Sequence, residues 1–120
     1  MNMELHGNSV IDLQNIITIC RGDEGKMEKY LVQFIELIPE RLEQLKLSLK
    51  DGDRIMIRQI LHKMSPQIQF FGVQNITTLI RRLEFEYDSM PLEELEVLLR
   101  KIFVKLEAAI DEVAKLINRL

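Results

Sequence analysis

Two histidines and one cysteine are the side chains of this 120-residue chain with the most versatile chemistry. A neutral imidazole offers a ring nitrogen that can act as a nucleophile or a metal ligand. His6 and His62 are too few for a histidine-rich cluster, and Cys20 alone excludes an internal disulfide or a multi-cysteine zinc site. The Glu-x-x-His pairs of di-iron bundles are missing, since Gln59 stands three residues before His62. We therefore expect no metal site.

Other catalytic signatures are also missing from the sequence. It contains no Gly-rich phosphate loop, nucleophile elbow or kinase motif. Its acidic pairs are interpreted as solvated helix surface, namely Glu84 with Glu86 and Glu93 with Glu94. Sixteen basic against nineteen acidic residues give a net charge of −3, which argues against a nucleic-acid-binding domain. Cys20 lies on an apolar stripe and is expected to be a buried small hydrophobe.

Helical periodicity runs through most of the chain, so the side chains of His62, Cys20 and the acidic pairs are expected to be positioned by helices. Apolar residues recur at steps of three and four, which indicates amphipathic helices. The predicted segments are 10–20, 23–50, 54–71, 73–87 and 91–120. The pattern favours an all-α fold, an antiparallel up-down four-helix bundle with an additional short N-terminal helix, as one domain over residues 1–120.

Capping residues and prolines refine the predicted helices. We expect a cap near Ser9 for the first helix, Gly52 at the end of the second, and Asp53 as the N-cap of the third. Pro39 is expected to bend the second helix without ending it. The third helix should continue through Pro66, with a local bend, because its apolar spacing stays in phase on both sides.

The predicted third helix turns His62 away from its buried face, at about 100° per residue. Its buried residues are expected to be Ile57, Ile60, Leu61, Met64, Ile68 and Phe71. The outer face around His62 collects Ile55, Arg58, Gln59, Lys63, Ser65, Pro66, Gln69 and Phe70. A tolerated surface histidine is the simplest interpretation. Pro66, however, costs ~3 kcal/mol in a helix interior without compensation, so this proline and the apolar flanks favour a docking surface.

The stretch IRQILHKMSPQIQFFGV resembles the signature of histidine-containing phosphotransfer (HPt) domains. In that pattern an apolar residue stands two positions after the histidine and a glycine ten positions after it, as His62, Met64 and Gly72 do here. Ser65 and Pro66 depart from the pattern, because many members carry Lys and Gly there. The string HKMSP resembles a proline variant found at the end of bacterial hybrid sensor kinases.

The resemblance extends over residues 10–120. The lead-in DLQNIITICRGDEGKMEKYLVQFIELIPERLEQLKLSLKDGD and the later ITTLIRRLE are similar to the segments before and after the family's histidine helix. It implies that His62 accepts a phosphoryl group from a receiver-domain aspartate and passes it to another receiver, with no kinase activity of its own. The Mg²⁺ and the acceptor aspartate would belong to the receiver, so this chain needs no cofactor.

The partners follow from the same resemblance. A receiver domain would dock through Ile55 and Phe70, inside a ring formed by Arg58, Gln59, Lys63 and Gln69. Either Arg58 or Lys63 would supply positive charge beside the phosphorylated imidazole. The rest of a hybrid sensor kinase is a further partner.

No run approaches the roughly 18 apolar residues of a membrane span, and the N-terminus is unlike a signal peptide. We expect a soluble cytoplasmic monomer that contacts neither nucleic acid nor membrane. Two alternatives stay open: a non-catalytic helical adaptor, and a degenerate HPt fold that binds a partner without phosphotransfer.

Overall fold

The structure, a computed structural model, describes residues 9–119, and within this range it contains five helices and no strand. The helices are α1 (Leu13–Ile19), α2 (Glu24–Asp51), α3 (Arg54–Phe71), α4 (Thr77–Glu86) and α5 (Leu92–Arg119). The all-α prediction is thus confirmed for the described residues. His6, and the end of the last predicted helix at Leu120, lie outside them.

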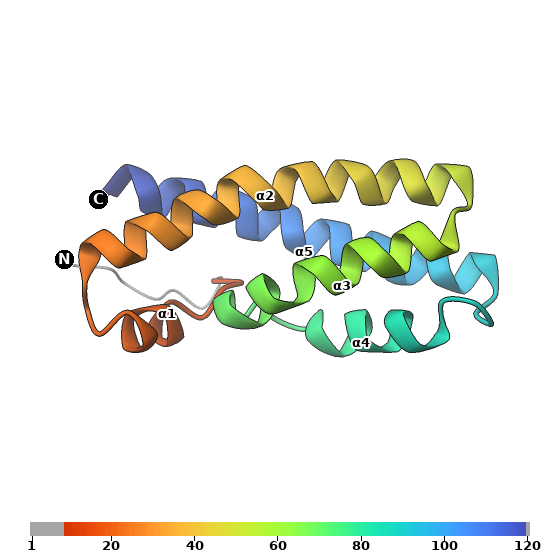
Figure 1. Ribbon diagram of the computed structural model, residues 1–120, viewed down its shortest axis with the longest axis horizontal. Helices are drawn as coiled ribbons and strands as arrows, with labels where there is room; N and C mark the ends of the chain where they lie inside the picture. Colours follow the sequence, from red (N-terminus) through yellow and green to blue (C-terminus); the bar gives the residue numbers. More distant parts are fainter. Residues whose placement is uncertain (1–8, 120) are drawn as a thin grey trace.

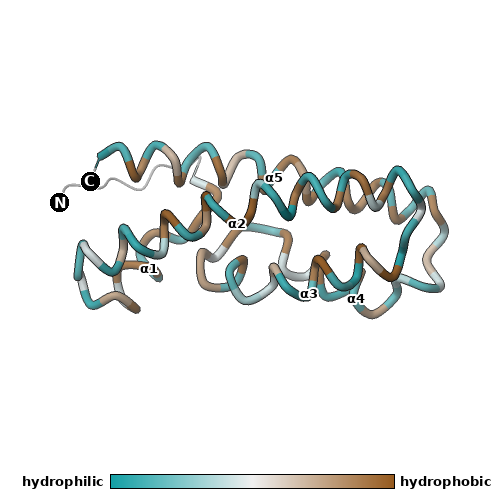
Figure 2. The backbone as a smooth tube through the Cα atoms, turned by 45° about the horizontal axis from the view of Figure 1, so that its top comes forward, coloured by the Kyte–Doolittle hydropathy of each residue, from teal (hydrophilic) through white to brown (hydrophobic). Residues whose placement is uncertain are grey.

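Helices α2 to α5 run in alternating directions along the long axis of the molecule (Figure 1). Helices α2 and α4 each pack against both α3 and α5, while α1 packs against α3. Apolar and polar residues alternate along the helices (Figure 2). The buried apolar side chains form one hydrophobic core. No helix within residues 9–119 is long and apolar enough to cross a membrane.

Helix α3 has the predicted bounds because each of its ends carries the capping residue that the sequence predicts. The Asp53 carboxylate accepts a hydrogen bond from the Met56 amide at the N-terminus, and Gly72 ends the helix in the left-handed region with φ of +59°. Pro66 lies inside the helix, as predicted. All six residues predicted to face the core are buried, including Phe71, whose ring centroid lies 4.3 Å from that of Phe34 on α2.

The predicted start of the first helix is wrong. Helix α1 begins at Leu13, and Asp12 is its N-cap, with a side chain that accepts from the Asn15 amide. The Ser9 hydroxyl does not cap a helix but donates to Glu112 on α5, at 2.6 Å. Val10 has the helical spacing but lies in the non-helical segment that precedes α1.

The predicted start of the fourth helix is also wrong. Val73 and Ile76 are buried as the periodicity indicates, but they precede α4, which begins at Thr77. Asn75 between them has φ of +65°, a conformation that interrupts a right-handed helix. The Gln74 amide donates to the Val10 carbonyl at 2.8 Å, so the N-terminal segment pairs with this connection.

Candidate functional site

His62 lies in the middle of α3 with its side chain 79% exposed. The neighbouring side chains of Leu61 and Met64 are buried in the core, so the same helix fixes the backbone of His62 and presents its ring to the outside. Exposure of His62 was the sequence-based expectation and is confirmed. A helix that holds an exposed imidazole leaves a ring nitrogen accessible from outside the bundle.

Among residues 9–119 the imidazole has one polar contact, with Glu84 on α4. The His62 Nδ1 atom lies 3.0 Å from the Glu84 Oε1 atom, and the Glu84 side chain is only 21% exposed. A carboxylate can only accept a hydrogen bond, so this contact requires the proton on Nδ1. In the neutral ring the lone pair is then on Nε2, the nitrogen that does not contact Glu84. The pair thus fixes both the orientation and the tautomer of the ring.

The interpretation of Glu84 as solvated surface is wrong. Its position four residues after buried Ile80 and three before half-buried Tyr87 places it at the edge of the stripe that faces α3. That spacing was a signal in the sequence for a partly covered carboxylate. The alignment with His62 could not be predicted, because it depends on how far α4 is shifted along α3.

Arg58 and Tyr87 form a second contact between the same helices. The Arg58 guanidinium carbon lies 5.5 Å from the centroid of the Tyr87 ring, in a cation–π arrangement. Arg58 precedes His62 by one turn and Tyr87 follows Glu84 by about one turn. Because α3 and α4 run in opposite directions, the two contacts are in register.

Arg54 adds a third contact one turn earlier on α3. Its guanidinium donates to the carbonyl of Tyr87, at 3.0 Å, and to the carbonyl of Met90. These carbonyls belong to the end of α4 and the connection that follows it, where helical carbonyls lack intrahelical partners. The three contacts form a polar ladder, defined by the α3 residues Arg54, Arg58 and His62, that holds the end of α4 against α3.

The remaining predicted docking residues are spread over the outer face of α3. Lys63, Gln59, Gln69 and Pro66 are exposed, Ser65 is half-buried, and Ile55 is 62% exposed. Only part of the Phe70 ring is open to a partner, because the ring packs on Tyr30 of α2 with centroids 5.1 Å apart.

Gly72 contributes to the site through its backbone. A Cβ atom at this position would lie 2.6 Å from the Cβ of Asp12, closer than real side chains approach. The glycine therefore permits both the left-handed conformation and the close passage of the N-terminal segment. Gly72 stands ten residues after His62 because α3 ends there, and it does not contact the imidazole.

Among residues 9–119 no group of three or more His, Cys, Asp or Glu side chains is placed to hold a metal ion. Cys20 is buried, as expected for a small hydrophobe. The chemistry available around His62 therefore comes from one imidazole, one carboxylate and nearby cations.

The comparisons with solved structures identify the fold. The HPT domain of the Hpt sensor hybrid histidine kinase from Shewanella superposes with a TM-score of 0.81 at 18% sequence identity, over 92% of this chain and 96% of that one. Histidine-containing phosphotransfer protein B from Pseudomonas aeruginosa PAO1 gives 0.80 at 17% identity, over 95% and 99%. The chain thus has the fold of HPt domains, as the sequence resemblance implies. No protein-family model and no curated protein matches the sequence.

Proposed function

We propose that this chain is a phosphorelay intermediate that carries a phosphoryl group on His62. The scaffold is the antiparallel up-down four-helix bundle of α2 to α5, with α1 as the additional helix. The observation that carries the proposal is the exposed imidazole of His62, whose Nδ1 proton is held by Glu84 and whose Nε2 is free of that contact. The HPt fold of two solved relatives supports it.

The transfer step needs little more than this geometry. The Nε2 lone pair attacks the phosphorus of an aspartyl phosphate on a receiver domain, and the bond between phosphorus and the aspartate oxygen breaks. The electron pair returns to the aspartate carboxylate. Glu84 stabilises the positive charge that develops on the ring as the Nε2–P bond forms. Transfer to a second receiver is the reverse step, and Mg²⁺ is supplied by the receiver in both directions.

The docking surface follows the outer face of α3. Exposed Ile55 and half-buried Phe70 provide apolar contact two turns to either side of His62. Arg58 and Lys63 provide positive charge beside the phosphoryl group, and Arg58, one turn before His62, is held against the Tyr87 ring of α4. Gln59 and Gln69 complete the rim, with Ser65 and Pro66 in place of the Lys and Gly of many HPt domains. A transient contact below about 1,200 Å² is expected.

The chain acts in the cytoplasm as a carrier without kinase activity.

The test incubates the chain with a phosphorylated receiver domain and Mg²⁺. Acid-labile, base-stable label should appear on the wild-type chain and be absent from His62→Gln, while receiver binding stays within about twofold. Label on His62→Gln at the wild-type rate contradicts the proposal. Binding without label on the wild type indicates an adaptor or a degenerate fold.

The role of Glu84 is tested by two substitutions and a matched control. Glu84→Ala should slow transfer by about ten- to a hundredfold, since a hydrogen bond to a charged group contributes about 1.5–3 kcal/mol. Glu84→Gln should retain more activity because the amide oxygen of the glutamine still accepts a hydrogen bond from Nδ1–H of His62. Glu86→Ala is the control, because Glu86 lies on the same helix and pairs with Arg82. An equal loss in the Glu84 and Glu86 variants contradicts a specific role for Glu84.

A further inference from the structure

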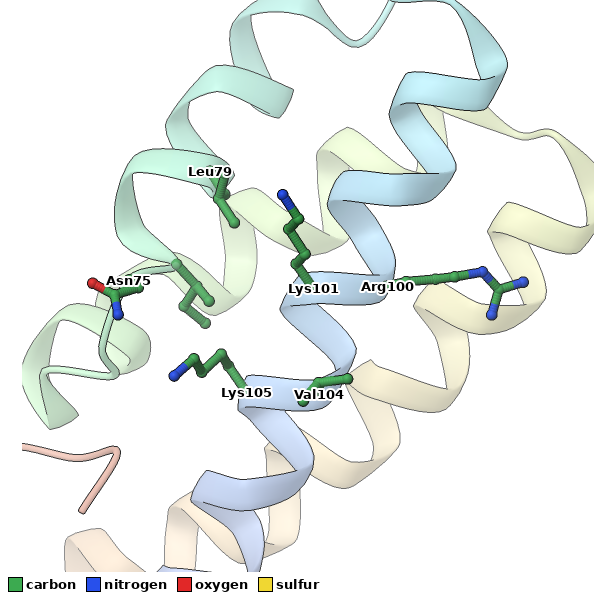
Figure 3. A pocket seen from close by; sticks show the side chains of 7 residues that line it. Asn75, Leu79, Arg100, Lys101, Val104 and Lys105 are labelled. Carbon is green, nitrogen blue, oxygen red and sulfur yellow. The ribbon is translucent and has the colours of Figure 1, made fainter. Parts of the chain in front are cut away.

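A cavity of about 400 Å³ lies between the start of α4 and the middle of α5. It is lined by Asn75, Ile76, Leu79, Arg100, Lys101, Val104 and Lys105, which we call the α4–α5 pocket (Figure 3). None of these residues belongs to the polar ladder or to the outer face of α3. The size is within the range of about 300–1,000 Å³ that is typical of small-molecule sites.

The walls of the pocket are apolar. Ile76 is buried, Leu79 is half-buried, and Val104 on α5 is 65% exposed. An occupant with an apolar body would remove the Val104 and Leu79 side chains from water, which is favourable in proportion to the area covered. Asn75 at the edge supplies the polar side chain of the α3–α4 connection (Figure 3).

The rim of the pocket is cationic. Lys101 and Lys105 extend on the side of α5 that faces Leu79 and Asn75, whereas Arg100 points away (Figure 3). Arg100 is paired with Glu96 at 2.7 Å, but neither lysine has an ion-pair partner within residues 9–119. No acidic residue lines the pocket. Two unpaired ammonium groups therefore border an apolar cavity in a chain whose net charge is −3.

We propose that the α4–α5 pocket binds a small amphipathic organic anion, in which an alkyl or aryl body carries one carboxylate. The body would cover Leu79 and Val104, and the carboxylate would lie between the ammonium groups of Lys101 and Lys105. An inorganic anion would leave the apolar walls in water, and a neutral or cationic amphiphile would leave the lysines unpaired. The site is independent of phosphotransfer at His62.

The test uses octanoate as the probe and follows the backbone amides of the full chain by ¹⁵N NMR. Residues 75–79 and 100–105 should shift on titration, with a Kd of about 1 mM, as expected for a ligand of this size. Two comparison ligands with the same alkyl body are 1-octanol and octyltrimethylammonium. Both should bind at least about fivefold more weakly. Equal affinity for octanol, or shifts confined to other residues, overturns the proposal.

Three variants assign the effect to the pocket. The double substitution Lys101→Gln with Lys105→Gln should weaken octanoate binding about fivefold, which corresponds to two exposed ion pairs. Val104→Glu places a carboxylate on the apolar wall of the pocket, three residues after Lys101, and should weaken binding at least about fivefold by repelling the anion. The 65% exposed position of Val104 makes the change compatible with folding. Lys115→Gln is the matched control on α5, because Lys115 already pairs with Asp111 at 3.0 Å. A loss in Lys115→Gln as large as in the double variant contradicts the assignment to the pocket. This result does not depend on whether His62 carries a phosphoryl group.

Discussion

The two turns at the ends of α3 have the same backbone conformation and different surroundings. Gly52 before the helix has φ of +66°, and a Cβ atom there would meet nothing within 4 Å. Gly72 after the helix has φ of +59°, and a Cβ atom there would lie 2.6 Å from the Cβ of Asp12. The first glycine is needed only for its dihedral angles, whereas the second is needed for its dihedral angles and its size.

The difference shows how the histidine helix is anchored. At the Gly72 end, the Asp12 amide donates to the Phe71 carbonyl at 2.8 Å, and the Asn15 side chain donates to the Phe70 carbonyl at 2.9 Å. These bonds satisfy carbonyls that have no partner inside the helix. The N-terminal segment therefore holds the end of α3 that follows His62. At the Gly52 end no other segment within residues 9–119 approaches the glycine, and the start of α3 is linked to its neighbours by the Arg54 side chain, which donates to the carbonyls of Tyr87 and Met90.

The largest predicted effect is on stability at Gly72. Gly72→Ala should lower the free energy of unfolding by about 3 kcal/mol, since a left-handed alanine costs about 1–2 kcal/mol and overpacking adds about 1–3 kcal/mol. Gly52→Ala should cost about 1 kcal/mol, from the dihedral angles alone. Urea unfolding of both variants gives the two values. Equal losses would contradict the crowding at Gly72.

A second substitution separates crowding from backbone strain. Asp12→Gly removes the Cβ that the new methyl group would meet, and glycine is tolerated at an N-cap at a cost of a few tenths of a kcal/mol. The double variant Asp12→Gly with Gly72→Ala should therefore recover at least about 1 kcal/mol relative to additivity. The same Asp12→Gly change combined with Gly52→Ala should be additive, because these residues do not touch.

The Asn15 bond should have an intermediate effect. Asn15→Ala leaves the Phe70 carbonyl without its side-chain donor and should cost about 1 kcal/mol in urea unfolding. Gln14→Ala is the matched control, since its exposed amide only reaches the Thr18 hydroxyl at 3.4 Å. That control should stay within about 0.5 kcal/mol of wild type. A cost at Asn15 no greater than at Gln14 would show that α1 does not anchor α3.

The smallest predicted effect is at an exposed ion pair between α2 and α5, where Lys46 meets Glu107 at 3.0 Å. The hydrogen bond from Lys46 to Glu107 raises the pKa of the lysine above its ordinary value. Its contribution is therefore complete below the usual lysine range and is lost as the pH rises through the raised pKa. Both side chains are exposed, so a double-mutant cycle at neutral pH should give less than about 1 kcal/mol. A coupling well above about 1 kcal/mol would contradict the weak contribution expected of an exposed pair.

The sequence predicts best what local chemistry determines. The bounds of α3 follow from Asp53 and Gly72, and its buried face follows from helical spacing. The α4 start is missed because Val73 and Ile76 have helical spacing and are buried in a connection that Asn75 turns by its positive φ. Burial alone therefore does not distinguish a helix from a connection that packs on the core.

The candidate site is predicted only where it depends on local sequence. Exposure of His62 follows from its own helix, so the spacing within α3 is sufficient. The contact with Glu84 depends on the register between α3 and α4, and the α4–α5 pocket depends on how closely α4 approaches α5. Such distances between elements are set by the packing of the whole core and have no signature in a single segment.

We propose that His62 is phosphorylated at Nε2 while Glu84 holds the proton on Nδ1. The most direct measurement is ¹⁵N and ³¹P NMR of the imidazole-labelled chain after incubation with a phosphorylated receiver and Mg²⁺. The account predicts phosphorus coupling to Nε2 of His62, with Nδ1 protonated in the free and phosphorylated states. Coupling to Nδ1, or a fully phosphorylated receiver that leaves His62 unmodified, would contradict it.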